Sequence, residues 1–148
     1  MTSGDRFVLC DAGHQHWGAY GAAGLFLASE GHVLLQHRAL WSHHGGTWGI
    51  PGGALTSDES PRAGALREVI EEAGLDTAAV EFVAELLDDH GGWTYTTIIA
   101  RAPHRLPVVA GRESIAVEWV LLDDLAGLDL HPGFAVTLRR VRDRLSSQ

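Results

Sequence analysis

The chain has 148 residues, and its 11 basic and 19 acidic side chains give a formal net charge of −8. A hydrophobic content of 45% and a charged content of 20% are typical of a globular protein, and the length predicts a single domain over residues 1–148. The negative balance argues against a nucleic-acid polymer or an anionic membrane as partner, because both require a basic surface. Acidic side chains also bind divalent cations, so the charge is compatible with a metal site.

A single cysteine, Cys10, excludes an intramolecular disulfide and favours a cytoplasmic location. Residues 1–17 carry charged side chains and lack the continuous apolar run of a signal peptide. No later segment approaches the roughly 20 apolar residues that a membrane span requires.

The first predicted structure is a hairpin with strands at 24–29 and 33–37, because two apolar runs flank a short polar turn. A loop at 39–48 follows, and then a tight non-regular turn at Pro51-Gly52-Gly53. A helix is predicted over 61–73, with Ser60 as its N-cap, proline at its first position and Gly74 just past its end.

Beyond this helix the pattern predicts alternating strands and one more helix. The predicted strands span 80–87, 94–100 and 116–122, and the helix runs from 132 to about 145. Consecutive strands with helices between them indicate an α/β fold, with a mixed sheet and helices packed against it.

The helix at 61–73 carries three carboxylates on one face. At about 100° per residue, Glu68, Glu71 and Glu72 fall within an arc about 100° wide. An apolar stripe lies on the opposite side, so we expect the helix to bury this stripe and to present the carboxylates. The stripe consists of Leu66, Val69, Ile70 and Ala73. Like charges at these spacings repel, so the cluster indicates either a solvated acidic face or an oxygen-rich site for Mg²⁺ or Mn²⁺.

Residues 53–75 resemble the Nudix box, whose pattern is G-x5-E-x7-R-E-U-x-E-E-x-G-U, with U a bulky aliphatic residue. All specified positions are met, by Gly53, Glu59, Arg67, Glu68, Val69, Glu71, Glu72, Gly74 and Leu75. So many matched positions make the resemblance specific. The runs GAAGLFLASEGHVLLQHR, GGTWGIPGG and EWVLLDDL extend the likeness to MutT-like members. The resemblance implies a Nudix-type α/β/α sandwich with a mixed β-sheet.

The resemblance also implies an activity, the hydrolysis of a nucleoside diphosphate linked to another moiety by metal-assisted attack of water on phosphorus. By position, the implied Mg²⁺ ligands are Glu68, Glu71, Glu72 and the backbone carbonyl of Gly52. Arg67 would orient Glu68, and Glu59 would in turn hold Arg67. Mn²⁺ is an alternative metal.

A further acid from outside the box usually completes such a site. Glu113 lies in a loop six residues before Trp119 and is a candidate metal ligand or general base, with a plain exposed loop glutamate as the alternative. Asp88 and Asp89 are rival candidates in the loop after a strand. Glu118, in a strand, is expected to face solvent.

Several side chains are candidates for substrate contacts. Arg38 ends the second strand of the hairpin, where its planar guanidinium suits a phosphate, and a structural ion pair is the alternative. Trp48 and Tyr95 could stack on a base, as could Trp41 and Trp93, and packing is the alternative for each.

The leading hypothesis is a Mg²⁺-dependent, MutT-like pyrophosphohydrolase that converts a (deoxy)nucleoside triphosphate, oxidised or not, to the monophosphate and pyrophosphate. An ADP-ribose or nucleotide-sugar pyrophosphatase is the nearest alternative. It is disfavoured because Gly91 and its neighbours stand where such members often carry a proline. A non-catalytic nucleotide sensor is a third hypothesis, disfavoured by the intact box. The expected partner is a small nucleotide, bound by a monomer or a homodimer.

Overall fold

The computed structural model describes residues 2–42 and 44–146 of the chain. Its main sheet has β3 (Ala22–Ser29) at the centre, in the order β5-β4-β3-β8-β7, with β6 added to β3 and β9 added to β4. The other strands are β4 (His32–Arg38), β5 (Trp48–Gly49), β6 (Gly52–Ala54), β7 (Glu81–Asp89), β8 (Thr94–Arg101) and β9 (Ser114–Leu121). β3 and β8 are parallel and the neighbouring pairs are antiparallel, so the predicted mixed sheet is confirmed.

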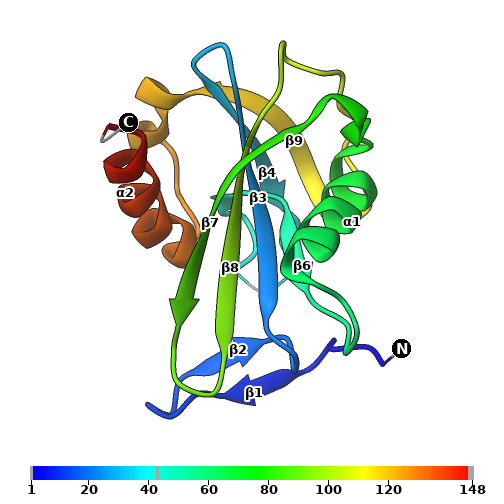
Figure 1. The fold of residues 1–148 in the computed structure, drawn as a ribbon, viewed down its shortest axis with the longest axis vertical. Helices are drawn as coiled ribbons and strands as arrows, with labels where there is room; N and C mark the ends of the chain where they lie inside the picture. Colours follow the sequence, from blue (N-terminus) through cyan, green and yellow to red (C-terminus); the bar gives the residue numbers. More distant parts are fainter. Residues whose placement is uncertain (1, 43, 147–148) are drawn as a thin grey trace.

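Two helices cover opposite faces of this sheet, which gives the expected α/β/α sandwich (Figure 1). They are α1 (Pro61–Ala73) and α2 (Pro132–Ser146). Side chains along β3 alternate between the two cores, as strand geometry requires. Leu25 and Leu27 lie in the cluster that includes Val69 of α1, whereas Phe26 lies in the cluster that includes Phe134 of α2.

β3 and β4 separate beyond their shared turn, and β6, which carries Gly52 of the site, pairs with β3 where they separate. The two strands pair only next to their shared turn, at Ala28 with Val33 and at Ser29 with His32. Farther along, β3 pairs with β6 while β4 pairs with β5 and β9. The Pro51 carbonyl accepts a hydrogen bond from a β3 amide, so the turn predicted at 51–53 is held at the point where the strands diverge.

The ends of α1 confirm the predicted capping. The Ser60 hydroxyl accepts a hydrogen bond from the Ala63 amide at 3.1 Å, and Gly74 ends the helix with φ of 59°. A Cβ at Gly64 would overlap Leu55 and would lie 3.1 Å from a Glu59 oxygen. The helical glycine therefore lets the loop before α1 pack closely against the helix.

The predicted burial of α1 was wrong at two positions. Ile70 is 50% exposed, whereas Glu72 is 4% exposed and belongs to the buried side of the helix. α1 packs on the sheet through Ala65, Val69 and Ala73, so its buried stripe is rotated from the one predicted. This rotation turns Glu72 toward the Gly52 amide.

Several short elements escaped prediction. β1 (Phe7–Leu9) and β2 (Gln15–Trp17) form a separate two-stranded sheet beneath the end of the main sheet (Figure 1). β5 and β6 lie where a loop and a turn were expected, and 3-10 helices span Thr77–Ala79 and Leu122–Gly127. These elements have two to six residues, too few for a periodic pattern to stand out.

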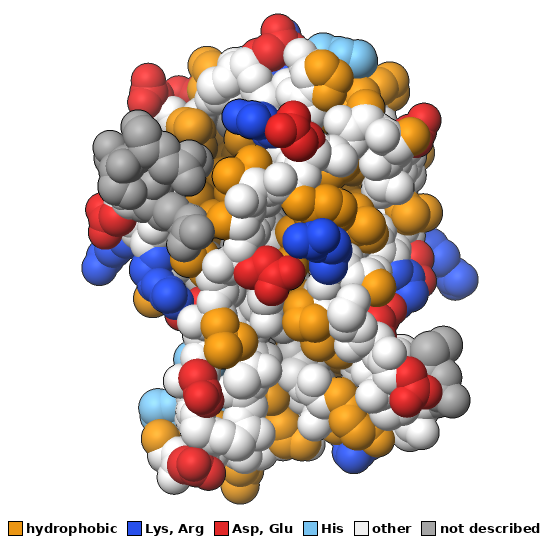
Figure 2. Space-filling model, viewed as in Figure 1, with side chains coloured by type: hydrophobic (Ala, Val, Ile, Leu, Met, Phe, Trp, Pro, Cys, Tyr) orange, Lys and Arg blue, Asp and Glu red, His pale blue; other side chains and the backbone are white. Residues whose placement is uncertain are grey.

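On the face drawn in Figure 2, arginine side chains are interspersed with acidic ones and form no continuous basic surface. Within the described ranges, no helix has the length and apolar character needed to cross a membrane.

Candidate active site

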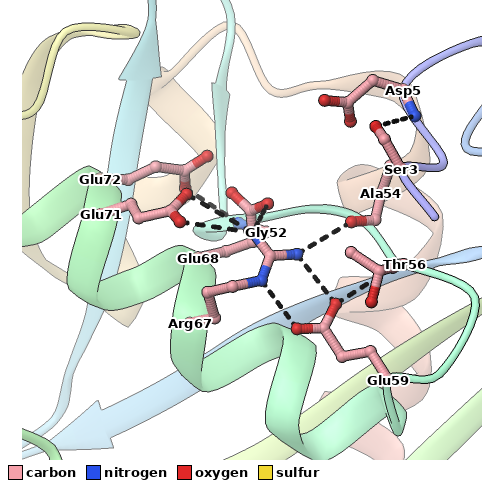
Figure 3. Close-up of polar contacts among 10 residues, drawn as sticks. All are labelled: Ser3, Asp5, Gly52, Ala54, Thr56, Glu59, Arg67, Glu68, Glu71 and Glu72. Atoms are coloured by element: carbon pink, nitrogen blue, oxygen red, sulfur yellow. Dashed lines mark hydrogen bonds and ion pairs between the residues drawn. The ribbon is translucent and has the colours of Figure 1, made fainter. Parts of the chain in front are cut away.

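Arg67 is the centre of a hydrogen-bonded network on α1 (Figure 3). Its Nε and Nη2 donate to the two oxygens of Glu59 at 2.7 and 2.9 Å, and Nη2 also donates to the Ala54 carbonyl at 3.1 Å. The Thr56 amide donates to the same Glu59 carboxylate at 3.2 Å. This hydrogen bonding lowers the pKa of Glu59 and raises the pKa of Arg67. The pair is therefore ionised and held in one geometry, as expected of a supporting contact.

Arg67 also reaches the carboxylates predicted to bind metal. Its Nη1 donates to Glu68 Oε1 at 2.9 Å and lies 3.5 Å from both Glu71 oxygens. Gly53 lies directly under Glu68, because a Cβ there would come within 2.7 Å of the Glu68 carboxyl carbon. The glycine turn and Arg67 thus hold Glu68 from two sides.

Glu68 and Glu72 form a buried acidic pair. The charges of the two carboxyl groups act on each other, and the Gly52 amide donates to Glu72 Oε2 at 3.0 Å. Burial, reinforced by the Glu68 charge, raises the pKa of Glu72 well above its usual value. Burial also raises the pKa of Glu68, against the opposing effect of Arg67. A positive charge between these carboxyls would offset their electrostatic repulsion.

The carboxylates lie along a cavity of about 840 Å³, a size that suits a small organic ligand. α1 contributes Glu68, Glu71 and Glu72, while β7, β8 and α2 contribute the opposite wall. Side chains of that wall include Asp88, Tyr95, Phe134 and Thr137. The cavity lining thus combines charged, polar and aromatic side chains.

Arg38 and Glu113 line this cavity together with the box carboxylates. Arg38 is half-buried at the end of β4, and its charge acts on Glu72. Glu113 is exposed, and its backbone carbonyl accepts from the Ala39 amide. The neighbouring Gly111 amide donates to the Glu72 carbonyl at 2.8 Å, which docks this loop on the end of α1.

The four aromatic side chains proposed for substrate contacts differ in whether they line the cavity. Tyr95 lines the cavity, with its hydroxyl crossing Gly24, and burial raises its phenol pKa with a further contribution from Glu72. Trp93 also lines the cavity, and its indole N–H donates to the Gly18 carbonyl at 3.0 Å. Trp48 is half-buried, stacks on His37 and packs against the core on the α2 side, outside the cavity lining. Trp41 is 71% exposed.

The described carboxylates are not arranged as a complete metal-binding group. Among the described residues, no three His, Cys, Asp or Glu side chains converge into a group that could hold an ion. Glu68 is engaged by Arg67 and Glu72 by the Gly52 amide, whereas the predicted Gly52 contact was its carbonyl. The donor set nevertheless fits a hard cation, because Glu68, Glu71 and Glu72 all line the cavity and offer carboxylate oxygens.

One wall of the cavity was missed by the sequence analysis. Gln15, His16 and Trp17 of β2 line it, and the His16 ring stacks on Trp93 at a centroid distance of 4.1 Å. The available sequence signal was weak, consisting of the turn at Gly13 between two three-residue strands.

Comparison with known proteins agrees with this geometry. A family model described as the NUDIX domain matches residues 19–143. The chain belongs to the Nudix family. This Nudix hydrolase acts on a nucleotide-linked substrate, and the resemblance to MutT-like members is confirmed.

The relatives include a Mycobacterium tuberculosis protein named "Putative 8-oxo-dGTP diphosphatase 3". It is 49% identical over 150 residues, which cover 94% of this chain and 69% of that protein. The crystal structure of the Nudix hydrolase RenU from M. smegmatis has a TM-score of 0.89 and 43% identity, covering 97% of this chain and 96% of RenU.

A bifunctional NMN adenylyltransferase/ADP ribose pyrophosphatase from Francisella tularensis, complexed with AMP and a Mn ion, is a more distant structural neighbour. It has a TM-score of 0.72 and 17% identity, covering 84% of this chain and 41% of that one. At this identity the likeness concerns the fold alone.

Proposed function

We propose that this Nudix hydrolase is a Mg²⁺-dependent pyrophosphohydrolase that converts a nucleoside triphosphate to the monophosphate and pyrophosphate. The observation that carries the proposal is the Glu68–Glu72 pair in the cavity lining, where burial raises the pKa of both carboxyls. Burial of two repelling carboxyls is unfavourable in the protein alone. It becomes favourable when a cation and a polyphosphate occupy the same space.

Glu68, Glu71 and Glu72 would hold the metal, with the Gly52 carbonyl and Glu113 as further proposed ligands. We propose Mg²⁺ as the metal. Mn²⁺, which accompanies AMP in the Francisella tularensis structure, binds the same kind of oxygen ligands. The bound cation would neutralise phosphate charge and make water a stronger nucleophile.

The remaining residues would act by positioning. Arg67 would hold Glu68, and Glu59 would hold Arg67, through the contacts that the two already make. Arg38 would bind a phosphate oxygen, because its charge lies close to Glu72 on the cavity wall. Glu113 remains our candidate for the general base, in a loop docked on α1.

The base would lie against the aromatic side chains of the cavity lining. Tyr95 would contact the substrate there, and a stacking role for Trp48 would require its ring to leave the core packing described above. The name of the Mycobacterium tuberculosis relative makes 8-oxo-dGTP the first substrate to test. We propose that the protein works in the cytoplasm as a monomer or homodimer.

The proposal is tested by incubating the purified protein with Mg²⁺ and a panel of nucleotides. The panel contains the common nucleoside triphosphates, 8-oxo-dGTP and ADP-ribose, and chromatography identifies the products. We expect a monophosphate and pyrophosphate from at least one triphosphate, and no products in excess EDTA. Cleavage of ADP-ribose alone would replace the proposal by the nucleotide-sugar alternative, and turnover of nothing would favour a sensor.

A further inference from the structure

His16 of β2 joins the small sheet of β1 and β2 to the turn between β7 and β8 (Figure 1). Its ring stacks on Trp93 with an angle of 8° between the ring planes, and the centroid of the His90 ring lies 4.8 Å from its own. The Asp11 amide donates to the Gly91 carbonyl at 2.7 Å, which holds the same two segments together through the backbone. A ring stack and a backbone hydrogen bond therefore attach the small sheet to the main one.

This junction is also part of the cavity wall. His16, His90 and Trp93 line the cavity together with the box carboxylates. The two histidines have no role in the proposed metal site. Any change in how the small sheet is attached would therefore alter the space that a nucleotide occupies.

The His16 ring is placed so that protonation is unfavourable. Its Nε2 atom is buried, and no described residue is a hydrogen-bond partner of this atom. A neutral imidazole needs a proton on only one of its nitrogens, whereas an imidazolium carries protons on both. Protonation would thus leave a charged N–H group buried without an acceptor, which costs more than an unpaired neutral group.

The neighbouring imidazoles add to this effect. Burial, together with the charges of His90 and His14, lowers the pKa of His16. An indole ring attracts a cation stacked on it, so the contact with Trp93 opposes this shift, but it supplies no acceptor for Nε2. The stack is therefore favoured while His16 is neutral.

Two carboxylates also lie at this junction, and both contact the backbone of the β7–β8 turn. Asp89 Oδ1 accepts a hydrogen bond from the Gly91 amide at 2.8 Å. Asp11 Oδ2 packs against Gly91, because a Cβ there would come within 2.7 Å of it. Neither of these contacts provides an acceptor for His16 Nε2.

We infer that His16 is a positioning residue whose neutral ring holds the β2 wall of the cavity against the β7–β8 turn, and that its protonation releases this wall. The inference concerns the regulation of the proposed nucleotide site by pH, and it rests on the proposed function only in assigning the cavity to a nucleotide. Because the pKa of His16 is lowered in the closed wall, the wall is most stable above the ordinary histidine pKa of about 6.5. It loses stability as the pH falls through that value.

Hydrogen–deuterium exchange of the wild-type protein tests the release of the wall and needs no nucleotide. The protection of the β2 amides, corrected for the intrinsic exchange rate, should fall about three- to tenfold from pH 7 to pH 5.5. One titrating group changes an equilibrium by at most about tenfold per pH unit. The amides of β3, in the core of the main sheet, should keep their protection. Equal protection of β2 at both pH values would overturn the inference.

His16→Phe separates titration from ring stacking, because phenylalanine keeps a ring against Trp93 and takes up no proton. We expect the β2 amides of this variant to keep their protection at pH 5.5. His104→Phe is the matched control, at an exposed histidine outside the cavity lining, and it should lose protection as the wild type does. A loss in His16→Phe equal to that of the wild type would overturn the inference. The wild-type comparison decides even if this variant does not fold.

Steady-state kinetics link the wall to nucleotide binding. Between pH 7 and pH 5.5, KM for the best triphosphate should rise about three- to tenfold more in the wild type than in His16→Phe, while kcat keeps the same pH dependence in both. Titration of the nucleotide affects both proteins alike, so an equal rise in KM would overturn the inference. Failure of the proposed function would look different, namely no hydrolysis of any triphosphate with the pH-dependent exchange of β2 intact.

Discussion

The Glu59–Arg67 contact and the Glu68–Glu72 contact meet at consecutive residues of α1, Arg67 and Glu68, yet they are opposite in charge. Glu59 receives two hydrogen bonds from Arg67 and one from a backbone amide, and its pKa falls. Glu68 and Glu72 face each other in a buried space, and both pKa values rise. One pair unites opposite charges, whereas the other brings two like charges together despite the Arg67 contact to Glu68.

This difference separates supporting carboxylates from reactive ones more clearly than their spacing does. In the sequence Glu59, Glu68 and Glu72 are all glutamates of one motif. In the structure the Glu59–Arg67 pair stabilises the fold, whereas the mutual repulsion of Glu68 and Glu72 is an unfavourable interaction that a bound cation would relieve. The following predictions test this contrast in order of expected effect.

Glu72→Gln should have the largest effect on activity. We expect kcat to fall by about 10³-fold, the scale of losing a group that stabilises transition-state charge. The assay is steady-state hydrolysis with the best nucleotide of the panel. Glu85→Gln is the matched control, because that side chain is half-exposed and makes a loose ion pair with Arg62 at 3.8 Å. Equal activity of the Glu72 variant would contradict the proposed metal site.

Arg67→Met should damage both activity and stability. Activity should fall 10- to 100-fold, as is typical when a residue that orients a metal ligand is removed. The free energy of unfolding should fall by about 1–3 kcal/mol, less than for a fully buried pair because the Arg67 side chain is 34% exposed. Urea denaturation measures this change.

The control for Arg67→Met is Arg101→Met. Arg101 pairs with Glu81 at 2.9 Å, but both side chains are more than half exposed, so we expect a change below about 0.5 kcal/mol. A stability loss as large as that of the Arg67 variant would show that burial does not distinguish the two contacts.

Without metal, Glu72→Gln should stabilise the protein at pH 8, by about 1–3 kcal/mol. Because the folded-state pKa of Glu72 is raised, the wild type is favoured below the usual carboxyl pKa and loses stability as pH rises through the folded value. Glutamine does not titrate, so the two proteins should converge near pH 4. Thermal denaturation in EDTA across this range is the measurement.

Glu59→Gln should show the opposite pH dependence. The lowered pKa of Glu59 adds stability above the usual carboxyl pKa, and this stability is lost as pH falls through the folded value. The variant should therefore be less stable than the wild type at pH 7 and approach it in acid. Parallel curves for the Glu59 and Glu72 variants would remove the distinction between the two pairs.

Glu113→Gln should have the smallest effect on stability, and its effect on kcat tests whether Glu113 is the general base. Because the side chain is exposed, we expect less than about 0.5 kcal/mol of destabilisation. If Glu113 is the general base, kcat falls by at least about 10²-fold and the acidic limb of the pH–rate profile is lost. An unchanged profile would assign the base to another carboxylate.

The sequence predicted much of this arrangement because its signals are local. Ser60, Pro61 and Gly74 set the ends of α1 through capping that involves only neighbouring residues, and both ends are confirmed. The box spacing placed Glu59, Arg67 and Glu68 in one motif, and the structure joins them by hydrogen bonds. Helical geometry is periodic, so such relations can be read from spacing.

Which side of α1 would be buried could not be read in the same way. Spacing placed Glu72 with the presented carboxylates and Ile70 with the apolar stripe, and the packing of α1 reversed both. The reason is that the burial of a side chain depends on the segment packed against it. Here the Gly52 amide donates a hydrogen bond to Glu72, so this carboxylate is buried although it was expected to face solvent.

By itself, the sequence determined the α/β class, the family and the identity of the box carboxylates, because these follow from local periodicity and a dense motif. Only the tertiary structure decided which carboxylates are satisfied, that β2 closes one wall of the cavity, and that Arg140 leaves one Asp88 oxygen unused. Those properties arise between residues far apart in the sequence, such as Asp88 and Arg140, which are 52 positions apart. Burial, charge pairing and unsatisfied polar atoms exist only once such distant segments meet.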